Sequence, residues 1–525
     1  MGIKGLWKII SPACKIQPLC EFAVVEGFRR GTEPGSEPVL MRIGVDGSTW
    51  MHEACTVFQH NHAGAGPSPE LWTLFYRLAR LHKVACHAHF VFDGKDRPAT
   101  KQGKRVKIAS HFLARGFQEL IVAFWFMWHT APGEAEAELA MMNHLARIDA
   151  VFTSDSDTFV FGAQCVMWST DAKPTTICVK VCTDDALLHG VGLPQSELIL
   201  LVLCRRGDYD QTGLSGCGSE IASWLTRYLL GKSLVNTIWY ESAVGLCKFL
   251  AKWCSDLCNI LACDPSGFLG QKYPRLAEAV PDDFLDINVL VQYVEPLASW
   301  SSMNWREHQP VGVVQSHQVD FVRLAAICEA CFEWSSVAIQ AKFWSDLWEG
   351  ACMHALCQLP ECLSGSYDLI FKILEYVPVP LGGMVATYRA YLTSSPLITA
   401  AYSGINMGDG QSMHHDTDSV TCSVPSGRER FAYICLLAPI LEYLKPAALK
   451  MFRCEKGLPP LLSPKPLPLL PASKWPSGSQ HIMTAANGRG NIIDLMKPTV
   501  TEVMNTLHGR LFPESEYKVI DLTAE

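Results

Sequence analysis

Two carboxylate pairs of the same make lie in the first third of the chain. Glu134 and Glu136 flank one alanine, and Asp155 and Asp157 flank one serine. At a helix start or in the turn after a strand, such a pair can direct both side chains into one cleft. Four carboxylates in one place would repel one another, raise one another's pKa and destabilise the fold unless cations compensated them. Because Mg²⁺ and Mn²⁺ take oxygen ligands, this stretch predicts a divalent metal site.

Three short apolar segments in the same part of the chain each end in an acid. They are Met41–Asp46, Ala88–Asp93 and Ala150–Asp155, and helical patterns such as Leu71–His82 and Ala135–Arg147 lie between them. Strands that alternate with helices predict a parallel sheet with helical crossovers. Ligands of open α/β sheets bind at the carboxyl ends of the strands. We therefore expect the three terminal acids to converge with the two carboxylate pairs.

The alternative is that these acids are surface carboxylates, which the helix dipole favours at helix starts. That explanation suits Glu134 and Glu136, which follow Pro132-Gly133. It does not explain acids at the ends of apolar strands. Asp208 also comes soon after an apolar run, Glu197–Cys204, and joins the predicted metal ligands.

A basic segment, Lys95–Lys107, separates the second predicted strand from the first carboxylate pair. By itself it would be a solvated surface loop. Beside an acidic pocket, however, a substrate with a phosphate backbone needs nearby cations. The candidates for this role are Lys95, Lys101, Lys104, Arg105 and Lys107. Beyond the segment, His111–Leu120 is predicted to be a helix and Ile121–His129 a buried strand.

A glycine-rich stretch after Asp208 predicts a hairpin between two short helices. Gly213, Gly216 and Gly218 would expose backbone N–H groups that can hold a phosphate, although a simple tight turn explains the pattern equally well.

Composition describes a globular protein of two to three domains. The 525 residues are 49% hydrophobic and 18% charged, with a net charge of −8. A nucleic acid would therefore be bound through local basic patches and metal ions. The longest apolar runs, Leu120–Trp128, Leu198–Cys204 and Phe431–Leu444, are shorter than a bilayer requires, so no membrane partner is expected.

The 21 cysteines are scattered, and no secretory leader precedes them, which favours free thiols in a reducing compartment. Cys254 and Cys258, Cys328 and Cys331, and His354 and Cys357 have metal-like spacing. Because each pair lies in a helical pattern without a second pair at zinc-finger distance, core packing is the preferred interpretation.

Six blocks of this sequence, in this order, resemble the XPG-type structure-specific nuclease superfamily, which includes flap endonucleases and Holliday-junction-cutting enzymes. The blocks are MGIKGLW, IGVDGSTWMHEA, FVFDGKDRPATKQGKR, APGEAEAELA, DAVFTSDSDTFVFG and RGDYDQTGLSGCG. They cover roughly residues 1–250, and weaker similarity reaches about residue 350. The short insert between Asp93 and Glu134 is more similar to the junction-cutting branch.

The resemblance implies a PIN-like α/β fold, with a central, mostly parallel sheet flanked by helices. The expected organisation is a nuclease domain over 1–200 with a short basic arch at about 95–130, and a helix-hairpin-helix region over 201–300. A helical C-terminal region over 301–400 and a low-order, proline-rich tail over 401–525 would follow. The tail is a predicted site for a protein partner.

The resemblance also implies roles for individual residues. Asp46, Asp93, Glu134 and Glu136 match the ligands of one Mg²⁺, and Asp155, Asp157 and Asp208 those of a second, with Mn²⁺ as a substitute. The family hydrolyses phosphodiester bonds with two metals about 3.5–4 Å apart. Lys101 and Arg105 fall among residues that contact the scissile phosphate or the arch. Gly2 matches a residue near the junction of the substrate duplexes, and the glycine hairpin matches one that holds duplex DNA around K⁺.

These features predict a Mg²⁺-dependent endonuclease acting on flapped or branched DNA in the nucleus, with dimerisation on junction DNA as a further expectation. Two alternatives remain. One is a catalytically weak or inactive protein that binds branched DNA on the same fold. The other is an RNA-directed nuclease of the related PIN-like fold. The Arg206-Gly207-Asp208-Tyr209 and Asp46-Gly47-Ser48 blocks depart from the family pattern, and the tail is not markedly basic.

Overall fold

The structure is a computed structural model. It describes residues 3, 5–27, 40–57, 67–101, 103–106, 111–170, 177–205, 207–210, 212–240, 243–281, 284–300, 319–357, 370–379, 385–393 and 431–459.

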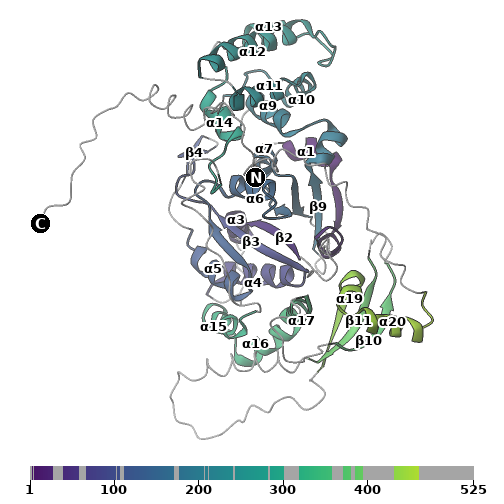
Figure 1. Cartoon of the computed structure of the whole chain (residues 1–525). Helices are drawn as coiled ribbons and strands as arrows, with labels where there is room; N and C mark the ends of the chain where they lie inside the picture. The colour runs from purple at the N-terminus through teal and green to yellow at the C-terminus, as the bar shows by residue number, and fades with distance from the viewer. Residues whose placement is uncertain are drawn as a thin grey trace, which may run out of the picture.

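A seven-stranded sheet forms the centre of the molecule, in the order β1-β9-β8-β7-β2-β3-β6 (Figure 1). Strands β6, β3, β2, β7 and β8 run parallel, and β9 is antiparallel to both of its neighbours. The predicted α/β fold with a mostly parallel sheet is confirmed. The strands are β1 (Lys15–Pro18), β2 (Met41–Asp46), β3 (Cys86–Phe92), β6 (Met127–Thr130), β7 (Ala150–Phe152), β8 (Cys165–Ser169) and β9 (Cys178–Thr183).

Helices cover both faces of this sheet and bury apolar side chains against it. In α4, for example, Leu71, Leu74, Phe75 and Leu78 are buried at helical spacing. One face carries α3 (Gly47–Val57), α4 (Pro69–His82) and α5 (Ala114–Ala123). The other carries α1 (Leu6–Ile10), α6 (Ala135–His144), α7 (Asp157–Val160) and α9 (Gln195–Arg205).

A group of helices continues the second face beyond α9, at the top of Figure 1. They are α10 (Ser219–Leu225), α11 (Leu230–Tyr240), α12 (Ala243–Cys263), α13 (Pro274–Glu278) and α14 (Ile287–Val294). Short helical turns complete the amino-terminal part: α2 (Leu19–Phe22), α8 (Asp184–Ala186), η1 (Ser11–Ala13), η2 (Ala23–Gly27), η3 (Leu187–Val191) and η4 (Thr226–Tyr228). The glycine stretch 212–218 connects α9 and α10, as predicted for a hairpin between helices.

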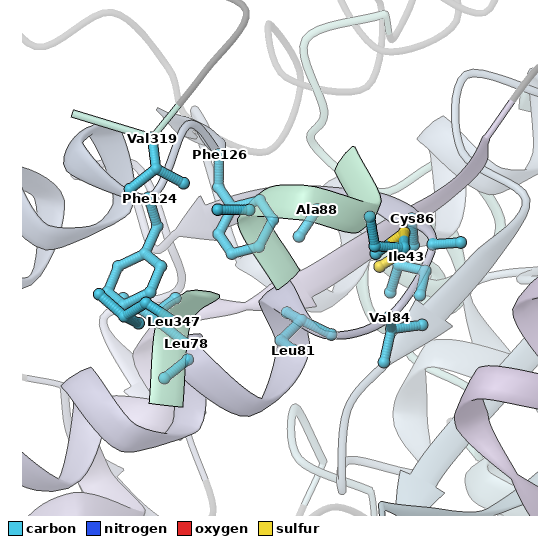
Figure 2. Packing of buried hydrophobic residues seen from close by; sticks show 14 of the residues in the cluster. Ile43, Leu78, Leu81, Val84, Cys86, Ala88, Phe124, Phe126, Val319 and Leu347 are labelled. Atoms are coloured by element: carbon cyan, nitrogen blue, oxygen red, sulfur yellow. The ribbon is translucent and has the colours of Figure 1, made fainter. Parts of the chain in front are cut away.

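A third helical group, from far along the chain, packs against the core around the central sheet. It consists of α15 (Phe321–Phe332), α16 (Ser336–Lys342), η5 (Phe343–Leu347) and α17 (Trp348–Cys357). These helices pack against α4 and α5 on the first face of the sheet. Figure 2 shows Val319, which precedes α15, and Leu347 of η5 beside Phe124 and Leu78 of the core.

A three-stranded antiparallel sheet corrects two predictions for the carboxyl-terminal half. It consists of β10 (Ile370–Val377), β11 (Thr387–Thr393) and β12 (Phe431–Leu437), followed by α19 (Ala438–Leu444) and α20 (Pro446–Glu455). The helical prediction for 301–400 is therefore wrong at β10 and β11, and the low-order prediction for 401–525 is wrong at 431–459. Buried side chains do recur at every second residue, as strands require: Tyr388 and Ala390 in β11, and Ile434 and Leu436 in β12. Their pairing was hidden because 37 positions separate Thr393 from Phe431.

The predicted arch is also shorter than 95–130. A small hairpin, β4 (Thr100–Lys101) with β5 (Lys104–Arg105), falls within it. The residues from 114 onward belong to the core, since Phe117 and Ile121 of α5 are fully buried. The predicted strand Ile121–His129 begins only at Met127, after a turn in which Trp125 has φ 66°. Apolar runs of this length do not distinguish strand from buried helix by periodicity.

Among the described residues, no single helix is long and apolar enough to cross a membrane. Two consecutive helical segments, Asp184–Val191 and Gln195–Arg205, together have the length and composition of a membrane span, but the chain bends by 74° between them. In α9, Leu198–Cys204 are buried inside the protein.

Candidate metal-binding active site

The predicted acids meet at the carboxyl edge of the central sheet. Asp46 is the last residue of β2, Asp93 follows β3, and Asp155 follows β7. Glu134 caps the amino terminus of α6, which follows β6, and Glu136 lies in the first turn of that helix. Strands β6, β3, β2 and β7 are neighbours in the sheet, so their ends bring these side chains together. With Asp157 at the start of α7 and Asp208 after α9, they form the acid cluster: Asp46, Asp93, Glu134, Glu136, Asp155, Asp157 and Asp208.

Most of the acid cluster is removed from solvent. Six of its residues are buried, none more than 8% exposed, and Asp93 is half-buried. Backbone N–H groups orient several of the carboxylates: that of Ala135 donates to Asp93 at 3.0 Å, and that of Ile3 donates to Asp157 at 2.8 Å. The second contact brings the amino-terminal segment to the site.

Asp46 is held from two sides. The backbone N–H and the hydroxyl of Thr49 donate to its two carboxylate oxygens at 2.8 and 2.6 Å. The hydroxyl of Thr153, after β7, lies 3.4 Å from the same carboxylate. These contacts fix one acid of the cluster against the first turn of α3.

Burial and mutual repulsion raise the pKa values of most of these carboxyl groups. Burial, then Glu136 and Asp93, raise the pKa of Asp46 well above its usual value. Burial, then Glu136, raise the pKa of Asp155 to about 7. The pKa values of Asp93, Glu134 and Asp157 are also raised, with burial as the main cause and a neighbouring carboxylate next. The site therefore holds protons more tightly than free carboxylates do.

One lysine stands among the acids and compensates part of their charge. The Lys101 ammonium lies 2.8 Å from Glu134, 3.3 Å from Glu136 and 3.3 Å from Asp208. Burial would lower the pKa of Lys101, but the surrounding carboxylates outweigh it and hold that pKa well above its usual value. Although burial opposes it, Lys101 is also the main cause that lowers the pKa of Glu136. The positively charged Lys101 side chain thus lies where three acids converge.

Two interactions missed in the sequence complete the site. The Tyr209 hydroxyl donates to Glu134, and its ring packs on Tyr293 of α14 at 4.9 Å between centroids. Arg97 forms an ion pair with Asp93 at 2.8 Å. The sequence signal for the Tyr209 contact was the position of this residue directly after the predicted ligand Asp208. For Arg97, the signal was its place within the basic segment.

The other predicted DNA-binding residues differ in their placement. Lys95 and Arg105 are exposed, and Lys101 is the one of these three described side chains that forms ion pairs with the acids. Lys104 lies in β5, but its side chain is outside the described structure, as are Gly2 and Lys107.

The glycine hairpin has the backbone that its sequence requires. Gly213 and Gly216 have φ values of 51° and 87°, in the region that favours glycine. Gly218 precedes α10 as its N-cap, and a Cβ there would meet nothing within 4 Å. Asp210 orders the loop by accepting from the backbone of Thr212 at 2.7 Å. The exposed Gly216 and Gly218 leave this turn open to a ligand.

The donors of the acid cluster suit hard divalent cations. In the described part of the chain, no three His, Cys, Asp or Glu side chains are already spaced as ligands of one ion. In five of the seven acids, burial and then a neighbouring carboxylate raise the pKa: Asp46, Asp93, Glu134, Asp155 and Asp157. Oxygen-only donors of this charge fit Mg²⁺ or Mn²⁺.

Two family models match the part of the chain that builds this site. Residues 1–111 match the XPG N-terminal domain, and residues 126–208 match the XPG I-region. These two segments of the chain are similar to the XPG-type nuclease superfamily. The XPG N-terminal match contains Asp46 and Asp93, and the XPG I-region match contains the other five acids.

Curated relatives match part of this chain. Flap endonuclease GEN homolog 1 of Homo sapiens is 28% identical over 263 residues, which are 46% of this chain and 27% of that protein. Flap endonuclease GEN-like 1 of Arabidopsis thaliana is 30% identical over 215 residues, 35% of this chain and 34% of that protein. The chain therefore spans only about a quarter to a third of the length of these relatives.

Solved structures extend the likeness in fold. A eukaryotic junction-resolving enzyme GEN-1 binding cesium is 25% identical with a TM-score of 0.66. The Holliday junction-resolving enzyme GEN1 in complex with product DNA and Mg²⁺ is 24% identical with a TM-score of 0.65. Each comparison covers 87% of this chain and all of the solved chain. The likeness in fold to these solved structures thus extends well beyond the two segments that match the family models.

Proposed function

We propose that this protein is a Mg²⁺-dependent endonuclease that cleaves branched DNA, a 5′ flap or a four-way junction, by hydrolysis of a phosphodiester bond. The observation that carries the proposal is the convergence of seven acids from separate segments at one edge of the sheet. A structural role does not account for this arrangement, since burying like charges together destabilises a fold.

In this proposal, divalent cations balance the negative charge of the acid cluster. Asp46, Asp93, Glu134 and Glu136 would hold one Mg²⁺, and Asp155, Asp157 and Asp208 a second. When bound, two such ions supply an activated water and stabilise the leaving oxyanion. The carboxylates themselves fix the position of the ions, because strand ends and helix starts orient them.

Basic residues and the glycine hairpin would hold the DNA. Lys101 is 24% exposed in its side chain, so it can turn from the acids to the phosphate that is cut. Exposed Lys95 and Arg105 lie on the same segment and would contact the backbone. The open backbone of Gly213–Gly218 would grip the uncut duplex, and a K⁺ ion there is part of the proposal. The solved structure of the GEN1 enzyme in complex with product DNA and Mg²⁺ supports DNA and Mg²⁺ as ligands in this proposal.

The double variant Glu134→Ala with Glu136→Ala tests the proposal. In Mg²⁺, wild-type protein should cut flap, splayed-arm, nicked or four-way DNA. The variant should lose more than about 10³-fold in rate, which is about 4 kcal/mol of transition-state stabilisation. Glu329→Ala with Glu333→Ala is the matched control; both glutamates are exposed, one in the last turn of α15 and one directly after it. Undiminished cutting by the acid variant would refute the proposal.

The same substrate panel separates the alternatives. Binding of branched DNA without product, in either Mg²⁺ or Mn²⁺, would favour the non-catalytic DNA-binding protein. Faster cutting of single-stranded RNA than of flap DNA would favour the RNA-directed nuclease.

Three further features belong to this proposal. They are a nuclear location, dimerisation on junction DNA and a protein partner for the 401–525 segment. Imaging of the tagged chain, light scattering of the complex with a four-way junction, and affinity capture with the 401–525 segment deleted would test them in turn.

A further inference from the structure

A chain of hydrogen bonds crosses three elements next to the acid cluster. His89 of β3 lies 2.7 Å from His129 of β6, between Nε2 and Nδ1. His129 Nε2 lies 2.9 Å from Oε1 of Glu138 in α6. The other oxygen of Glu138 accepts from the backbone N–H of Ser299 at 2.7 Å. The chain thus joins the central sheet to the segment that follows α14.

Glu138 is the centre of this chain and is completely buried. Each of its two oxygens has one donor, so the carboxylate is satisfied without a cation. Burial, as the main cause, lowers the pKa of His89 to about 3, which keeps that ring neutral. A neutral His89 can donate to His129, and His129 then donates to Glu138.

The position of Glu138 on α6 links this chain to the acids. It lies one helical turn after Glu134 and two residues after Glu136. The residue before Glu134 is also covered by the same segment: a Cβ on Gly133 would lie 2.9 Å from the carbonyl oxygen of Leu297. Residues 297–299 therefore lie against the first turn of α6 at two points.

We propose that Glu138 is a positioning residue that holds the first turn of α6, with its two acids, against β6 and residues 297–299. This inference rests on the proposed function, since the acids must be held for metal ions to bind. His129 acts with Glu138 by fixing its carboxylate from the strand side. Supporting contacts of this kind change metal affinity by about 10- to 100-fold when removed.

Two substitutions separate hydrogen bonding from packing. Glu138→Leu keeps the bulk but leaves the Ser299 N–H and His129 without an acceptor. Glu138→Gln keeps one acceptor for Ser299, and its amide can donate to His129 in the other tautomer. The matched control is Glu197, a completely buried carboxylate that accepts from the backbone of Gly231 and Lys232 at 3.3 and 2.9 Å.

The experiment measures Mg²⁺ binding by isothermal titration calorimetry and amide hydrogen exchange of the metal-free protein. Glu138→Leu should weaken Mg²⁺ binding by about 10-fold or more. It should also accelerate exchange at Ser299 and in the first turn of α6. Glu138→Gln should recover most of both. Glu197→Leu should leave Mg²⁺ affinity unchanged and affect exchange only around α9 and α11.

Equal Mg²⁺ affinities for Glu138→Leu and Glu197→Leu would overturn the inference, and so would unchanged exchange at Ser299. If Glu138→Leu does not fold, His129→Leu decides it: loss of the donor to Glu138 should accelerate exchange at Ser299, whereas a packing role predicts unchanged exchange there. Failure of the wild type to bind Mg²⁺ would refute the proposed function instead. The exchange at Ser299 and in α6 would then still decide the positioning role.

Discussion

The carboxyl edge of the central sheet and the junction of α9 with α11 both bury carboxylates, but they satisfy them differently. Glu197, at the junction, receives two backbone N–H donors. At the sheet edge, three members of the acid cluster share the Lys101 ammonium, and burial followed by mutual repulsion raises the pKa values of most of its carboxyl groups. The first site is complete as a structural element. The second fits the proposed function, in which divalent cations would supply the further positive charge.

Removal of the compensating lysine should have the largest effect. Lys101→Met leaves three buried acids without their cation, which should lower the metal-free free energy of unfolding by about 3 kcal/mol. Urea denaturation at pH 7 measures it, and added Mg²⁺ should restore much of the loss. The control is Lys232→Met, since Glu197 uses only the backbone N–H of that residue. A loss of equal size in both variants would remove the contrast between the sites.

Removal of a carboxylate should have opposite consequences at the two sites. Glu197→Ala leaves two buried backbone donors unsatisfied and should cost about 2 kcal/mol of folding stability. Asp155→Asn relieves repulsion in the acid cluster, so the metal-free protein should be unchanged or more stable. Thermal unfolding in a chelator compares them. Equal destabilisation would show that the acid cluster is structural.

The pH dependence should follow the raised pKa of Asp155. A carboxyl group with a folded pKa of about 7 and an ordinary unfolded pKa binds its proton more tightly in the folded state. Its contribution to stability is therefore present below pH 4 and is lost as the pH rises through 7, at up to about 1.4 kcal/mol per pH unit. Mg²⁺ binding should release protons in this window, measurable by calorimetry in buffers of different ionisation enthalpy. Asp155→Asn should release fewer.

The smallest effect should come from the tyrosine beside the acids. Tyr209→Phe removes the hydroxyl that donates to Glu134, a net loss of about 1 kcal/mol, and should weaken Mg²⁺ binding about five-fold. Tyr228→Phe is the matched control, because that hydroxyl donates to Asp264 on a different loop. Titration calorimetry of both variants measures the difference, and identical affinities would leave Tyr209 outside the site.

Residue type and spacing were enough to predict the acid cluster and the sheet beneath it. An apolar strand such as Met41–Asp46 carries its own signal, because β-forming residues and a terminal acid are local features. The order of parallel strands then requires their carboxyl ends to meet. Glycine content is also a local feature, so Gly213 and Gly216 could be assigned to a turn before their φ values were known.

The tertiary structure alone decided which distant groups complete the site. Lys101 among three acids, Tyr293 beneath Tyr209, and Ser299 on Glu138 are contacts between segments far apart in the chain. No local pattern encodes them, since packing of whole helices determines the partners. The small sheet of β10, β11 and β12 was missed for a related reason: strand pairing is a property of two segments, and a sequence displays them one at a time.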